Sequence, residues 1–139
     1  MYNKVGFAVF ACSFAALPLA ASAEVASVKE TRTGLAGEIS IATDHAGYAL
    51  ASQNLNGVHM HLHHVLNCLE GPKGKDFDRI IENPCGTAGG GAIPDATDAA
   101  TKVKLQSVET TALSGVEASD EAAARGAARD VQAALRALK

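Results

Sequence analysis

The stretch "NGVHMHLHHVLNCLEG", residues 56–71, gathers four histidines and a cysteine in one segment that contains no proline. Its apolar residues recur every three or four positions, which places their side chains on one face of an α-helix. Glycine followed by proline, at positions 71 and 72, is typical of a helix end. The segment therefore predicts a helix whose histidines flank a buried apolar stripe.

Upstream, the chain contains no proline back to about Gly34, and a second set of apolar residues recurs there at helical spacing. At about 100° per residue, the two apolar sets point in nearly opposite directions along one continuous helix. The segment between them, "SQNLNG" at residues 52–57, has low helix propensity. Either two helices meet here, or one long helix changes its packing partner, and both arrangements stay open.

Downstream, two segments rich in turn-forming residues precede the last helices. "DFDRIIEN", residues 76–83, predicts a short helical turn with its apolar side chains facing inward. "GTAGGGAIP", residues 86–94, has the composition of a flexible linker. The inward-facing side chains of the short turn would be Phe77, Ile80 and Ile81.

Two more helices are expected in the C-terminal third of the chain. Asp95 can cap the first, which would run to about Leu113, and Ser119 with the acidic residues after it begins the second. Alanine is abundant, and few β-branched or aromatic residues alternate after the first 23 residues. We therefore predict an all-α fold, a small three- or four-helix bundle with one disulfide-closed loop.

The first 23 residues, "MYNKVGFAVFACSFAALPLAASA", are typical of a secretory signal peptide. An apolar run follows Lys4, and a small-x-small sequence ends the segment, which is too short and wrongly flanked for a membrane span. We predict that residues 1–23 are cleaved, that residues 24–139 form a single helical-bundle domain, and that the product is periplasmic or secreted without membrane insertion. A lipidated Cys12 is the rival interpretation, but bulky Phe10 disfavours it.

Export and composition narrow the chemistry of this domain. Lys4 is the only charged residue in the signal peptide, so the domain carries 11 basic and 15 acidic residues, a net charge of 11 − 15 = −4. Nucleic-acid binding is not expected, because no basic patch accompanies this charge. In an oxidising compartment, the default state of Cys68 and Cys85 is a disulfide, and a thiolate ligand at Cys68 is the alternative.

The histidines divide into two pairs on a helical wheel. His59 and His63 are four residues apart, the commonest spacing with which a helix offers two nitrogens to a metal ion. His61 and His64 are three apart and lie on the other flank of the apolar stripe. Met60 could add a thioether for copper(I). Side-chain amides and a hydroxyl on the His59 strip could orient the rings: Ser52, Asn56 and Asn67.

The fifth histidine, His45, is interpreted differently. It lies 14 residues before His59, which is about 21 Å along one straight helix. We therefore interpret His45 as exposed or held in an ordinary polar contact.

We predict an exported protein that binds copper, zinc or nickel for metal buffering, transport or sensing. The expected ligands are His59 and His63 in the first place, with His61, His64 or Met60 as additional ligands. Two imidazoles rarely fill the coordination sphere of a metal ion, so a second copy of the chain or a protein partner could supply a further ligand. Two alternatives remain: a structural or protein-interaction bundle without metal, and a haem-binding protein with histidine ligation. No nucleophile elbow or triad order is present, so the sequence favours binding over catalysis.

Overall fold

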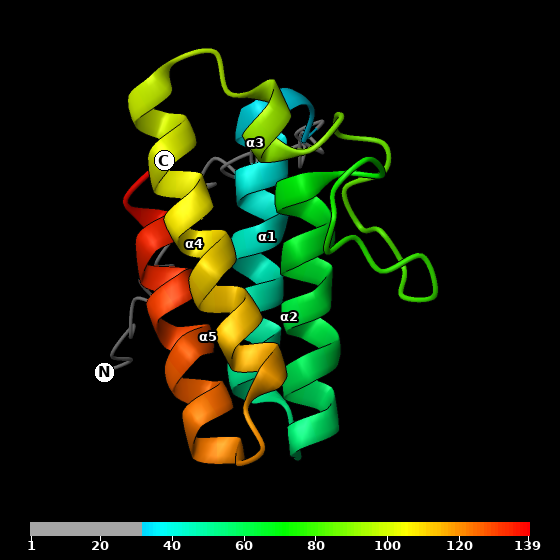
Figure 1. Cartoon of the computed structure of the whole chain (residues 1–139), viewed down its shortest axis with the longest axis vertical. Helices are drawn as coiled ribbons and strands as arrows, with labels where there is room; N and C mark the ends of the chain where they lie inside the picture. Colours follow the sequence, from blue (N-terminus) through cyan, green and yellow to red (C-terminus); the bar gives the residue numbers. More distant parts are fainter. Residues whose placement is uncertain (1–31) are drawn as a thin grey trace, which may run out of the picture.

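The computed structural model describes residues 32–139, and the predicted signal peptide lies outside this range. The described chain is all-helical, and four long helices run alternately in opposite directions, with one short helix over one end of the bundle (Figure 1). The predicted all-α bundle is confirmed. The helices are α1 (Gly34–Ala51), α2 (Leu55–Glu70), α3 (Ala92–Asp95), α4 (Ala99–Glu117) and α5 (Glu121–Arg136).

The segment between α1 and α2 answers the question that the sequence leaves open. The backbone at Ser52 is extended, with φ −62° and ψ 151°, and this ends α1. Asn54 then begins α2, because its side-chain oxygen accepts a hydrogen bond from the Gly57 amide at 3.0 Å. The chain reverses over a few residues, so α2 lies antiparallel beside α1 (Figure 1). Residues 34–69 therefore form two helices.

Small side chains allow the helices to approach closely. Ala42, Ala46 and Ala49 of α1 have no accessible surface. On α4, a methyl group added at Gly115 would lie 2.7 Å from the Leu62 side chain on α2, and as close to α5. Leucines and valines from three long helices fill the remaining interior. The largest buried aliphatic side chains are Val58, Leu62, Val65, Leu66, Leu69, Leu105, Val131 and Leu135.

The predicted disulfide is confirmed: Cys68 of α2 is bonded to Cys85, which closes a loop between them. The loop is not helical at residues 76–83, and the prediction of a helical turn there is wrong. The Asn67 side chain makes two hydrogen bonds with the Asp78 backbone: it donates to the carbonyl at 3.0 Å and accepts from the amide at 2.9 Å. These bonds replace helical ones, and Ile80 is left 95% exposed.

The glycine-rich segment makes specific contacts, in place of the free linker that its composition predicts. The Gly91 amide donates to the buried Glu38 carboxylate on α1 at 2.6 Å. Gly71, which ends α2 with φ +66°, packs so tightly on Gly90 that a methyl group would lie 1.7 Å from its carbonyl oxygen. This packing connects the ends of α1 and α2.

The caps of the last two helices differ partly from the prediction. Asp98, and not Asp95, caps α4 by accepting from the Thr101 amide at 2.8 Å. Asp95 instead accepts from the Gly90 amide at 3.0 Å. Asp120 caps α5, one residue after the predicted start at Ser119. Within residues 32–139, none of the helices has the combination of length and apolar character that crossing a membrane requires.

Candidate metal centre

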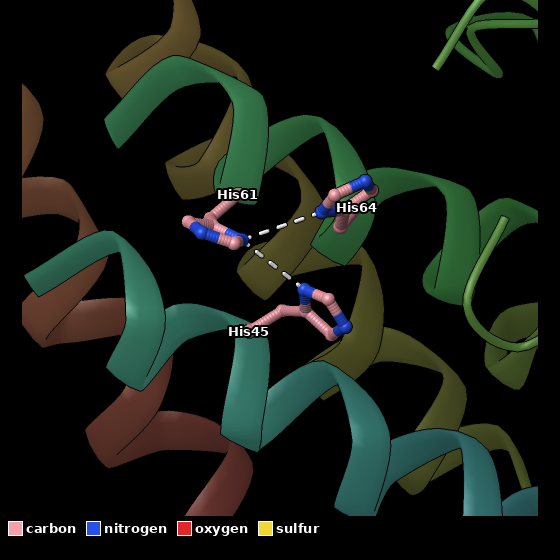
Figure 2. Close-up of side chains that lie close together, drawn as sticks. All are labelled: His45, His61 and His64. Atoms are coloured by element: carbon pink, nitrogen blue, oxygen red, sulfur yellow. Dashed lines mark hydrogen bonds between the residues drawn. The ribbon is translucent and has the colours of Figure 1, made fainter. Parts of the chain in front are cut away.

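Three histidine rings converge between α1 and α2, and we call them the three-histidine site: His45, His61 and His64. The Nδ1 atom of His61 lies 3.3 Å from the Nδ1 atom of His45 and also 3.3 Å from the Nδ1 atom of His64 (Figure 2). The ring centroids of His45 and His64 are 4.6 Å apart. One nitrogen of each ring lies within 4.8 Å of the other two. The arrangement brings together three nitrogens that could bind one metal ion.

Two features of the chain produce this convergence. His61 and His64 are three residues apart on α2, so both rings project toward the same side of that helix. His45 meets them from α1, because the chain reverses at Gln53 and places residues eight positions before and after it opposite each other. The helical spacing supplies the pair on α2, and the antiparallel packing supplies the third ring.

The two short contacts at His61 cannot both be good hydrogen bonds. A neutral imidazole nitrogen has one in-plane position, which holds either a hydrogen or a lone pair. The Nδ1 atom of His61 therefore satisfies at most one neighbour by hydrogen bonding. A cation placed among the three nitrogens would accept a lone pair from each of them.

The distances also indicate which coordination geometry fits. Zinc–nitrogen bonds of about 2.0–2.1 Å at tetrahedral angles separate two ligand nitrogens by about 3.3–3.4 Å. Adjacent ligands in a square plane with the same bond length lie about 2.8–3.0 Å apart. The two separations of 3.3 Å at His61 match the tetrahedral value, and the nitrogens of His45 and His64 lie within 4.8 Å of each other.

Burial keeps these rings neutral. Burial, followed by the charges of His64 and His61, lowers the pKa of His45 to about 4, and Asp44 acts in the opposite direction. Burial also lowers the pKa of His61 and of His64, and His64 is only 8% exposed. Neutral imidazole is the form that binds metal, so all three rings are in the ligating state at neutral pH.

The other pair predicted from the sequence is not part of this group. The Nε2 atom of His59 lies 3.1 Å from the Ala118 carbonyl oxygen, beyond the end of α4. The Nδ1 atom of His63 lies 4.0 Å from the Asp78 carboxylate in the disulfide loop. Met60 is 41% exposed. Metal binding by His59 and His63 stays a prediction, and His61 and His64 are the predicted residues that the structure brings together.

His45 is the residue that the sequence reasoning missed. Its 21 Å separation assumed one straight helix, whereas the observed chain reversal brings it against α2. The usable signal was that His45 and His61 lie eight residues before and eight residues after Gln53, which belongs to the weak segment at 52–57. Comparisons of the chain with protein-family models, curated proteins and solved structures find no match.

Proposed function

We propose that the protein binds a transition-metal ion through His45, His61 and His64. The observation that carries this proposal is the contact of the His61 Nδ1 atom with two imidazole nitrogens, each at 3.3 Å. Three neutral nitrogens from two rigid helices are held close together before any ion arrives. Such preorganisation increases affinity, because little side-chain freedom is lost on binding.

Zinc is the ion that the nitrogen separations favour, because they match tetrahedral bonds. Copper or nickel in a square plane would need shorter separations between adjacent ligands. Three protein ligands leave the fourth tetrahedral position for water or a ligand from outside. His45 and His61 are only partly buried, which gives an ion a path to solvent. Reversible binding of this kind suits metal buffering, transport or sensing.

The choice of ligands is consistent with export to the periplasm or the cell exterior, which we propose from residues 1–23. The Cys68–Cys85 disulfide persists in an oxidising compartment. Imidazoles, unlike thiolates, do not oxidise to disulfides there. We retain His59 and His63, with Met60, as candidates for a second and weaker ion, because the buried Nδ1 atom of His63 has no hydrogen-bond partner among the described residues.

Cobalt(II) titration of chelator-treated protein, followed by zinc competition, tests the proposal directly. Tetrahedral cobalt gives intense visible absorption, and about one equivalent is expected to bind and to be displaced by zinc. Tyr48 supplies a second readout, because its ring centroid lies 5.3 Å from that of His45 and 5.6 Å from that of His61. The chain has no tryptophan, and Tyr48 is the only tyrosine after the signal peptide. Bound cobalt or copper is expected to quench its fluorescence.

Matched histidine variants identify the ligands. His45→Gln is expected to weaken cobalt and zinc binding by about tenfold or more, because two imidazoles remain. His59→Gln makes the same chemical change outside the site and is expected to leave the first equivalent unchanged. Equal affinity of the wild type and His45→Gln would refute the three-histidine site. Loss of the first equivalent in His59→Gln alone would move the site to His59 and His63.

A further inference from the structure

A second group of potential ligands lies where α2 ends, and its donors are oxygens. Glu70 is the last residue of α2, Asp76 belongs to the disulfide loop, and Glu109 lies on α4. One carboxylate oxygen of each lies within 4.8 Å of the other two. We call these three residues the carboxylate cluster. It joins three segments of the chain and shares no residue with the three-histidine site.

One oxygen of the cluster, on Glu70, is buried without a partner among the described residues. Glu70 is only 6% exposed, and its Oε2 atom accepts a hydrogen bond from the Asp76 amide at 2.8 Å. Its Oε1 atom is inaccessible to water and receives no hydrogen bond from residues 32–139. The Oδ2 atom of Asp76 is also inaccessible to water, and it forms an ion pair with the Lys75 ammonium at 3.1 Å. A buried carboxylate oxygen without a partner is costly.

The charges around the cluster do not balance. Lys75 offsets one of the three carboxylates, and its side chain is 77% exposed, so solvent weakens its effect. Burial, followed by contact with the Glu109 carboxyl, raises the pKa of Glu70 to about 7. Either a proton or a cation can relieve this crowding. The carbonyl end of α2, which carries partial negative charge, also favours a cation.

We propose that Glu70, Asp76 and Glu109 bind a calcium ion. Calcium takes oxygen ligands at about 2.3–2.6 Å, so opposite oxygens on one ion lie up to about 5 Å apart. The separations in the cluster fall within this reach. Magnesium, with bonds of about 2.0–2.1 Å, demands near-ideal octahedral geometry and usually keeps several of its water ligands, whereas calcium accepts irregular sets of carboxylate oxygens.

A recess beside the cluster leaves room for the remaining ligands of the ion. Its volume is about 260 Å³, and Glu70, Glu109, Gln106 and Gly74 contribute to its walls. Water molecules and the Gln106 amide oxygen could complete the six to eight ligands that calcium prefers. The ion would connect the disulfide loop and the end of α2 to α4.

Calorimetric titration of chelator-treated protein with calcium chloride at about pH 7.5 tests this site. We expect about one calcium ion per chain, with a dissociation constant at or below about 1 mM, as in extracellular calcium modules. Glu109→Gln removes one charge from a partly exposed position and is expected to weaken binding about tenfold or more. Glu117→Gln is the matched control, because it makes the same change on the same helix at an exposed position.

Several outcomes decide the question. Unchanged calcium affinity in Glu109→Gln, or no binding by the wild type up to about 5 mM calcium, would overturn the proposal. Equal affinities for calcium and magnesium would overturn the choice of calcium. His45→Gln is expected to bind calcium like the wild type, which keeps this test separate from that of the three-histidine site. Circular dichroism of each variant confirms that the helices are intact.

Discussion

Acidification is expected to destabilise the metal-free protein through His45. Its pKa is 6.5 in the unfolded chain and about 4 in the folded one, so between these values the unfolded state binds the extra proton. Stability from this ring is therefore fully present above pH 6.5 and is lost as the pH falls toward 4. The 2.5-unit difference corresponds to at most about 3.4 kcal/mol, at about 1.36 kcal/mol per unit. Because the ring is only half-buried, we expect on the order of 2 kcal/mol.

Urea denaturation followed by far-ultraviolet circular dichroism measures this loss. The wild type and His45→Gln are compared at about pH 7 and pH 4.5, with chelator present throughout. The carboxyl groups of Glu38 and Glu70, whose folded pKa values are raised, change stability in the opposite direction. They are common to both proteins, so the difference between the two proteins isolates His45. An identical loss of stability in both proteins would refute the reasoning.

Three further changes test the disulfide, the end of α2 and the interior of α5. Reduction of the Cys68–Cys85 disulfide is expected to lower the free energy of unfolding by about 3 kcal/mol, measured by urea denaturation with and without a phosphine reductant. Gly71→Ala is expected to lower the free energy of unfolding by about 3 kcal/mol or more, because its φ is +66° and the Gly90 carbonyl oxygen blocks a methyl group. An unchanged melting temperature would contradict this. Gly126→Ala is expected to stabilise the protein by about 0.5–1 kcal/mol, because Gly126 lies within α5 and no neighbouring side chain or other helix lies within 4 Å of the added carbon. A lower melting temperature would contradict this prediction.

Local sequence patterns correctly predicted the features of the fold that depend on interactions between residues close together in the sequence. The helical spacing around Leu62 and Leu66 predicted the buried face of α2, and Gly71 marked its end. Such features depend on side chains a few residues apart, which a linear sequence displays directly. The prediction of a helical turn at residues 76–83 was wrong because that segment is shaped by a contact with a distant residue. Its backbone groups bind Asn67 of α2, a partner outside the segment.

The predicted metal chemistry depended on the histidines of α2, and two of them, His61 and His64, lie in the three-histidine site. The four-residue spacing favoured His59 and His63 as the first ligands, and nothing in the sequence indicated that His61 and His64 would meet a third ring. His59 lies beside the end of α4, whereas His63 lies near the disulfide loop, and both neighbours depend on how distant segments pack. The choice between the pairs therefore required knowledge of the neighbouring elements.

By itself, the sequence determined an all-helical chain, a disulfide between Cys68 and Cys85, and a helix rich in imidazoles. Only the tertiary structure decided that α1 folds back against α2 and brings His45 to the pair on that helix. The physical reason is that a helix defines the neighbours of a side chain within about one turn. A contact between two helices depends on the reversal between them, where a few weak helix formers left two arrangements open.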